Sequence, residues 1–118
     1  MNNRTYGNWG EEQAVLYIEK LGYQLLGRNF RNRLGEIDII AKDKETICFI
    51  EVKTRYSLAK GKPFESVNYQ KKRKLINLAL SYLKYNYQTT SIKSRFDVIS
   101  IIQHTYTEYE IKHIKNAI

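Results

Sequence analysis

The sequence is poor in residues that interrupt or cross-link a chain. It has one proline, six glycines and one cysteine among 118 residues. No proline- or glycine-rich linker therefore divides it, and no disulfide can form within the chain. Its apolar runs are only a few residues long, whereas a membrane-spanning helix needs about 20. The first residues also lack the apolar stretch of a signal peptide, so we expect one cytoplasmic domain over residues 1–118.

Acidic residues are scarce relative to basic ones. The chain has 20 Lys and Arg against 12 Asp and Glu, which gives a net charge of +8. On so small a body this charge favours a polyanionic partner, and nucleic acid is the class we expect. The alternative is a basic, solvated surface without a ligand. An anionic membrane is less favoured, because no segment pairs a basic face with a broad apolar one.

The spacing of apolar residues predicts a mixed α/β domain. Helical spacing predicts helices over residues 9–21 and 66–86, and the apolar stripe of the second consists of Val67, Leu75, Leu78, Ala79, Tyr82 and Leu83. Segments rich in β-formers predict strands over residues 23–30, 36–41, 47–54, 96–102 and 107–114. A loop is expected over residues 58–64. The order α-β-β-β-α-β-β predicts a mixed central sheet flanked by helices.

Two charged residues occur in the most strand-like segment of the chain. Glu51 and Lys53 follow the run Ile47-Cys48-Phe49-Ile50, and they share a face because side chains alternate along a strand. A carboxylate and an ammonium at the end of a buried strand need either each other or a ligand. Taken alone, these two residues are most simply interpreted as an ion pair where the strand emerges.

The position of Asp38 favours a ligand site over a simple ion pair, because it places a second carboxylate near Glu51. A hairpin turn at residues 43–44 sets Asp38 opposite Phe49, on the face of Glu51 and diagonal to it. Facing carboxylates repel unless a cation or proton lies between them, and Mg²⁺ takes oxygen ligands of this kind. The same register sets Glu36 opposite Glu51. We interpret Glu36 as a solvated residue at the strand start, with a further ligand as the alternative.

A third carboxylate lies on the expected apolar face of the first helix. Ala14, Val15 and Ile18 follow Glu11 by three, four and seven residues, so all four lie on the stripe that packs against the sheet. Glu11 is therefore a candidate third ligand. The alternative is a residue at the helix start that the helix dipole favours.

A series of short motifs extends over nearly the whole chain. They are Gly10-Glu11-x-x-Ala14, Gly22-Tyr23, Arg28-Asn29-Phe30-Arg31, Gly35-Glu36-Ile37-Asp38, Phe49-Ile50-Glu51-Val52-Lys53-Thr54-Arg55, Arg95-Phe96-Asp97-Val98 and His113-Ile114-Lys115-Asn116-Ala117. In order and spacing they resemble the YraN-like family of uncharacterised bacterial proteins, which is related to Holliday-junction resolvases. The resemblance implies a restriction-endonuclease-like fold of the PD-(D/E)xK superfamily, and it implies a fold more firmly than an activity.

The site pattern of that family falls on Glu11, Asp38, Glu51 and Lys53 of this chain. By resemblance, the three carboxylates and the Val52 carbonyl hold Mg²⁺ or Mn²⁺, and Lys53 orients water or stabilises charge on the phosphate. The expected function is metal-dependent hydrolysis of DNA phosphodiester bonds, with branched or single-stranded DNA among the candidate substrates. The alternatives are a non-catalytic nucleic-acid-binding module and an adaptor for an acidic partner. A monomer and a homodimer are both open.

Basic residues gather at the start of the second expected helix. Residues 71–74 are all basic, and positive charge there opposes the helix dipole unless an external anion binds. A solvated basic patch is the alternative. The residues that we assign to nucleic-acid contact are Arg31, Arg55, Lys71, Lys72 and Arg73.

Asp97 resembles Asp38 in its place near the start of an apolar strand, but it has no Glu-x-Lys segment as a partner. We therefore interpret Asp97 as structural and expect it to pair with Arg95 or another basic residue. His104 and His113 are too isolated in the sequence to indicate a metal site.

Overall fold

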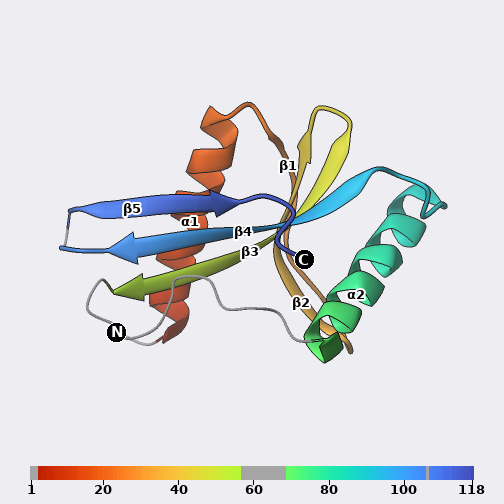
Figure 1. Cartoon of the computed structure of the whole chain (residues 1–118), viewed down its shortest axis with the longest axis horizontal. Helices are drawn as coiled ribbons and strands as arrows, with labels where there is room; N and C mark the ends of the chain where they lie inside the picture. Colours follow the sequence, from red (N-terminus) through yellow and green to blue (C-terminus); the bar gives the residue numbers. More distant parts are fainter. Residues whose placement is uncertain (1–2, 57–68, 106) are drawn as a thin grey trace.

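The computed structural model describes residues 3–56, 69–105 and 107–118 and places their strands in one five-stranded mixed sheet (Figure 1). The elements in chain order are α1 (Asn3–Lys20), β1 (Gln24–Asn32), β2 (Gly35–Asp43), β3 (Thr46–Tyr56), α2 (Tyr69–Tyr87), β4 (Ser94–Gln103) and β5 (Tyr109–Ile114). This order confirms the predicted mixed α/β fold. Within the described ranges, no helix is long and apolar enough to cross a membrane.

The boundaries differ from the predicted ones mainly at the first helix. Helix α1 begins at Asn3 rather than at residue 9, ahead of the first apolar residue at helical spacing. The predicted start followed the apolar stripe of Ala14, Val15 and Ile18, and such a stripe does not show how far a helix extends before it. The predicted loop over 58–64, the helix start at residue 66 and Val67 lie outside the described residues.

The strands lie side by side in the order β1-β2-β3-β4-β5. Strands β1 to β3 are antiparallel neighbours, β3 and β4 are parallel, and β5 returns antiparallel to β4. The parallel pair requires a crossover connection, and α2 lies within it. After β3, the spacing of apolar residues changes from every second residue to helical spacing. The segment therefore forms a helix that packs back onto the sheet.

Each helix covers its own face of the sheet with the predicted apolar stripe. On one face Ala14, Val15 and Ile18 of α1 are buried in a cluster with Ile39 and Ile50 of the sheet. On the other face the four residues of α2 that pack in a cluster with Phe49 and Ile40 are Leu78, Ala79, Tyr82 and Leu83. The sheet is therefore the middle of three layers.

The register between β2 and β3 differs from the prediction by two residues. Asp43 pairs with Thr46 and Ile40 with Phe49, so the turn lies at residues 44–45 rather than 43–44. Lys44 adopts a φ of 57° there, a conformation that the sequence does not signal with the usual Asn-Gly or Asp-Gly pair. Because the shift is even, it leaves every side chain on its predicted face.

Candidate functional site

Strands β2 and β3 stop pairing at the predicted site. Their ladder ends at Ile39 and Ile50, and one further step in register brings Asp38 level with Glu51. The predicted pairs of Asp38 with Phe49 and of Glu36 with Glu51 are therefore wrong, although Asp38 and Glu51 still meet. Past the ladder, the Val52 N–H donates a hydrogen bond of 2.8 Å to Asp38 Oδ2. The backbone of β3 thus fixes one oxygen of the Asp38 carboxylate, while the proposed ligand role of the Val52 carbonyl stays a prediction.

Asp38 lies in an unbalanced electrostatic environment. Burial raises its pKa the most, and the hydrogen bond from Val52 lowers it. The charges of Glu11, Glu51 and Glu36 raise it further, and the resulting pKa is about 6 against an ordinary 3.8. Such a group of carboxylates has a strong affinity for a proton or a cation.

Helix α1 brings Glu11 to this group from the neighbouring layer. Its carboxylate is half-buried and lies 3.8 Å from Arg28, which also pairs with Glu12 at 2.6 Å. Burial is the largest cause that raises the pKa of Glu11, and Arg28 partly opposes it. The predicted approach of Glu11 from the apolar face of the first helix is therefore observed. Its role as a ligand stays a prediction.

Asn29 bridges two of the carboxylates, and sequence reasoning missed it. With its amide nitrogen turned toward them, Asn29 donates hydrogen bonds to the carboxylates of Glu36, at 2.9 Å, and Glu11, at 3.1 Å. Its φ is 55°, within the left-handed region that asparagine tolerates better than most residues. This conformation interrupts the alternation of β1, so that Arg28 pairs toward α1 whereas Phe30 packs with the α2 cluster.

Glu36 is part of this group rather than a fully solvated residue at the strand start. Its side chain is 32% exposed and pairs with Arg31 at 2.8 Å. The predicted phosphate-contact residue Arg31 is itself 71% exposed, so this pair lies at the outer rim of the acidic group.

Two lysines approach the Glu51 carboxylate. Lys53 Nζ lies 3.8 Å and Lys71 Nζ 3.3 Å from Glu51 Oε1. Lys53 shares β3 with Glu51, as the alternation predicted. Lys71 comes from α2, so the first turn of this helix brings one member of the basic run to the carboxylates. Its neighbours Lys72 and Arg73 are exposed, and Arg55 is half-buried near the end of β3.

The residues at Asp38 fit a divalent cation that retains much of its water. Among the described residues, no three Asp, Glu, His or Cys side chains converge closely enough to hold a metal ion by themselves. Mg²⁺ is commonly held by one or two carboxylates, with water and substrate phosphate completing its shell. Asp38 and Glu51 line one cavity, and the charge of Asp38 is not balanced by a basic group, so the pair fits Mg²⁺ or Mn²⁺ bound in this way.

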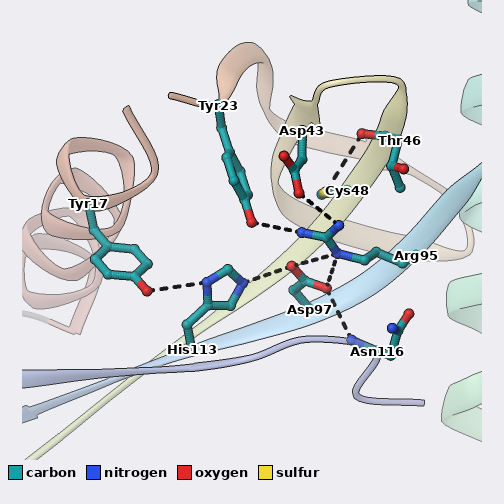
Figure 2. A network of polar contacts seen from close by, with 9 residues as sticks. All are labelled: Tyr17, Tyr23, Asp43, Thr46, Cys48, Arg95, Asp97, His113 and Asn116. Carbon is teal, nitrogen blue, oxygen red and sulfur yellow. Dashed lines mark hydrogen bonds and ion pairs between the residues drawn. The ribbon is translucent and has the colours of Figure 1, made fainter. Parts of the chain in front are cut away.

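A second polar cluster lies on the α1 side of the sheet (Figure 2). The Asp97 carboxylate accepts hydrogen bonds from Arg95 at 3.0 Å and from the Asn116 backbone at 3.2 Å, and it lies 2.8 Å from His113 Nε2. His113 Nδ1 in turn lies 3.3 Å from the Tyr17 hydroxyl. The predicted pairing of Asp97 with Arg95 is confirmed. The partners from α1 and β5 could not be predicted, because they are distant in sequence.

Arg95 ties this second cluster to the β2–β3 hairpin. Its guanidinium donates to Asp43 at 3.0 Å and to the Tyr23 hydroxyl at 2.8 Å. Burial raises the pKa of Asp97, but the hydrogen bonds of His113 and Arg95 lower it by more, so the net pKa is below the ordinary value. Every charge of this cluster thus has a partner.

The fold and the first cluster together define a mixed α/β protein with an acidic, lysine-flanked site at a junction of strands. The sequence profile described as "Uncharacterised protein family UPF0102" matches residues 10–101. The UPF0102 protein of Chlorobium phaeobacteroides (strain BS1) is 47% identical over 116 residues, which cover 94% of this chain and 91% of that protein. A UPF0102 protein of Clostridium botulinum (strain Hall) is 48% identical, and one of Clostridium acetobutylicum 46%, each over 98% of this chain and 94% of the relative.

The chain therefore belongs to the UPF0102 family. This membership confirms the assignment to a family of uncharacterised proteins that the motifs suggested. The names of the relatives state no activity, so the function has to be argued from the site.

Proposed function

We propose that this protein is a metal-dependent nuclease that hydrolyses phosphodiester bonds of DNA. The observation that carries the proposal is the position of Asp38, whose pKa of about 6 results from burial and from three neighbouring carboxylates. Acidic residues are concentrated there in a chain of net charge +8. Two lysines on Glu51 supply positive charge next to them. The resemblance to resolvase-related proteins with a restriction-endonuclease-like fold supports the same reaction.

In the proposed reaction, each residue of the site has its own role. Asp38 and Glu51 would hold Mg²⁺ or Mn²⁺, and Val52 keeps Asp38 oriented through its N–H. The bound cation would supply Lewis-acid chemistry at the phosphate and acidify a water molecule. Lys53 would place its ammonium beside the phosphate and stabilise developing negative charge. Glu11, held between Arg28 and Asn29, would orient water at the edge of the site.

A binding module without turnover is the second candidate function. It is favoured by one observation, namely that no three acidic, His or Cys side chains within the described segments converge on one point. In that case the carboxylates would shape an electrostatic boundary, and the basic residues would still bind phosphates.

The two candidates are separated by cleavage assays on linear, flapped and four-way DNAs with Mg²⁺ or Mn²⁺. We expect wild type to cleave at least one substrate and Asp38→Asn to cleave none, while its DNA affinity stays equal or rises. The affinity survives because the basic surface supplies it, and it can rise because a negative charge beside the phosphate is removed. Glu19→Gln, which removes an exposed acid on α1, is the matched control and should retain cleavage.

Absence of metal-stimulated cleavage in wild type, with DNA binding intact, would favour the binding module. Undiminished cleavage by Asp38→Asn would show that the site is assigned to the wrong residues.

A further inference from the structure

A small cavity adjoins the carboxylates on the α2 side of the sheet. Its volume is about 100 Å³, and Glu36, Asp38 and Glu51 lie along one part of its lining. Strands β2, β3 and β4 contribute its floor. Helix α2 contributes Leu75 and Lys71, and the C-terminal segment near α2 in Figure 1 contributes Ile118. The cavity therefore begins where the scissile phosphate would bind under the proposed function.

The other residues that line the cavity include apolar and aromatic ones. Leu75, Phe96 and Val98 are among them, and Val98 is the partner of Glu51 in the register of β3 and β4. The Phe96 ring is half-buried and lies 5.4 Å from the Phe49 ring at a tilt of 32°, so the two rings form one aromatic surface. A ligand that matches both kinds of lining residue needs a flat apolar body and hydrogen-bond donors at one edge.

We propose that this cavity binds one unpaired pyrimidine base of the DNA strand, next to the phosphate at Asp38 and Glu51. The inference rests on the proposed nucleic-acid function and deepens it. A paired base cannot enter, because it is stacked inside the duplex, and enzymes that reach single bases take them out of the stack. Its ring would lie against Phe96, and its N–H groups would face the carboxylates. Aromatic side chains and carboxylates are both known to recognise bases in this way.

The size and charge of the cavity exclude the obvious other ligands. An apolar cavity of roughly 150 Å³ encloses benzene, so a space of about 100 Å³ is too small to enclose a purine and can receive a single ring only in part, through its open mouth. Without a bound cation, a free phosphate inside the cavity would meet the carboxylates of Glu36, Asp38 and Glu51 against the single ammonium of Lys71, so it would be repelled. A wholly apolar ligand would displace water from the Asp38 carboxylate and offer it no hydrogen bond, which is costly.

The test uses duplexes with one unpaired nucleotide that is a pyrimidine, a purine or an abasic residue. Binding is measured without cleavage in EDTA, by fluorescence anisotropy of a dye attached to the end of each duplex, far from the unpaired nucleotide. Cleavage is measured separately with Mg²⁺. We expect the unpaired pyrimidine to bind roughly tenfold more tightly than the abasic residue, in line with the contribution of one stacked base.

Two substitutions at Leu75 alter the cavity without touching the carboxylates. Leu75→Phe fills it and should abolish the preference for a pyrimidine, whereas Leu75→Ala enlarges it and should let an unpaired purine bind as well. Leu80→Phe and Leu80→Ala are matched controls, because Leu80 lies on the same helix, is 41% exposed and does not line the cavity.

The outcomes separate this inference from the proposed hydrolysis. A pyrimidine preference that Leu75→Phe removes supports the base site even if no DNA is cleaved, in which case only the hydrolysis fails. Equal affinity of wild type for pyrimidine, purine and abasic duplexes overturns the base site, whether or not the DNA is cleaved. This wild-type comparison decides the question even if the Leu75 variants do not fold.

Discussion

Asp38 and Asp97 have similar sequence contexts, but their electrostatic environments in the folded protein are opposite. Each is the aspartate of an apolar strand, and burial raises the pKa of each. Around Asp97, Arg95 and His113 more than compensate for burial, and the net pKa falls. Around Asp38 the neighbours are further carboxylates, and the pKa rises to about 6. A buried acid with its charge balanced stabilises a fold, whereas one left unbalanced marks a place for a ligand.

The two environments also differ in how accessible the aspartate is to a ligand from solvent. Asp97 is fully buried, and its cluster connects α1, the β2–β3 hairpin, β4 and the C-terminal segment (Figure 2). Asp38 lies where β2 and β3 separate, next to an open cavity and to Lys71. Substitution of Asp97 should therefore affect folding, and substitution of Asp38 should affect ligands.

The largest effect that we predict is the loss of stability in Asp97→Ala. This variant leaves Arg95, whose side chain is only 12% exposed, with Asp43 as its remaining carboxylate. Removal of one partner of a buried ion pair costs about 3–5 kcal/mol. Urea unfolding at neutral pH measures the change. Asp97→Asn, which retains a hydrogen-bond acceptor, should lose less. A loss below about 1 kcal/mol in Asp97→Ala would contradict the structural role of the cluster.

The next effect concerns the cation and should appear only at the Asp38 site. Asp38→Asn should weaken Mn²⁺ binding by more than about a hundredfold, because substitutions outside the ligand shell already cost 10- to 100-fold. Lys53→Ala should lower cleavage while it retains Mn²⁺ affinity, since an ammonium does not ligate a cation. Calorimetric titration with Mn²⁺ measures the affinities, and Glu19→Gln is the control. Equal Mn²⁺ affinity in wild type and Asp38→Asn would remove Asp38 from the ligand set.

A smaller effect is a gain of stability in Asp38→Asn above pH 6 in EDTA. The folded protein binds the Asp38 proton more tightly than the unfolded chain does, so the ionised carboxylate destabilises the fold as the pH rises from about 4 to 6. A rise in pKa of this size corresponds to at most about 3 kcal/mol, and screening by solvent reduces it to about 1–2 kcal/mol.

Thermal unfolding across this pH range tests the gain. The advantage of Asp38→Asn over wild type should be present at pH 7.5, disappear below about pH 4, and shrink when Mn²⁺ stabilises wild type. Destabilisation by Asp38→Asn at pH 7.5 in EDTA would show that the Asp38 charge is balanced after all.

The smallest effect distinguishes the α2 surface next to the Asp38 site from other basic parts of the surface by their contribution to DNA binding. Replacement of Lys71, Lys72 and Arg73 by Ala should weaken DNA binding and reduce the log–log salt slope by about one for each lost phosphate contact. A control variant with Lys20, Lys42 and Lys112 replaced by Ala loses the same charge elsewhere and should retain the slope. Equal slopes in the two variants would show that net charge, and not the α2 surface, governs binding.

Local sequence patterns predicted the elements and the faces of the sheet. The stripes of α1 and α2 and the order of helices and strands along the chain follow from spacing alone, because burial on one side imposes a period on the chain. The meeting of Asp38 and Glu51 was also predictable, although the register was not. Their shared face depends only on whether residue numbers are odd or even, and a slip of two residues leaves that unchanged.

Tertiary structure alone decided which groups surround each aspartate. Apart from Arg95, which the sequence predicted, the partners of Asp97 come from β5 and the C-terminal segment, and Lys71 reaches Glu51 from a helix 20 residues further along the chain. Asn29 joins Glu11 to Glu36 only because its backbone adopts a left-handed conformation. The pKa of a buried carboxylate is set by such neighbours in space. The sequence therefore determined that this protein has two aspartates in apolar strands, and the fold determined which of them remains open to a ligand.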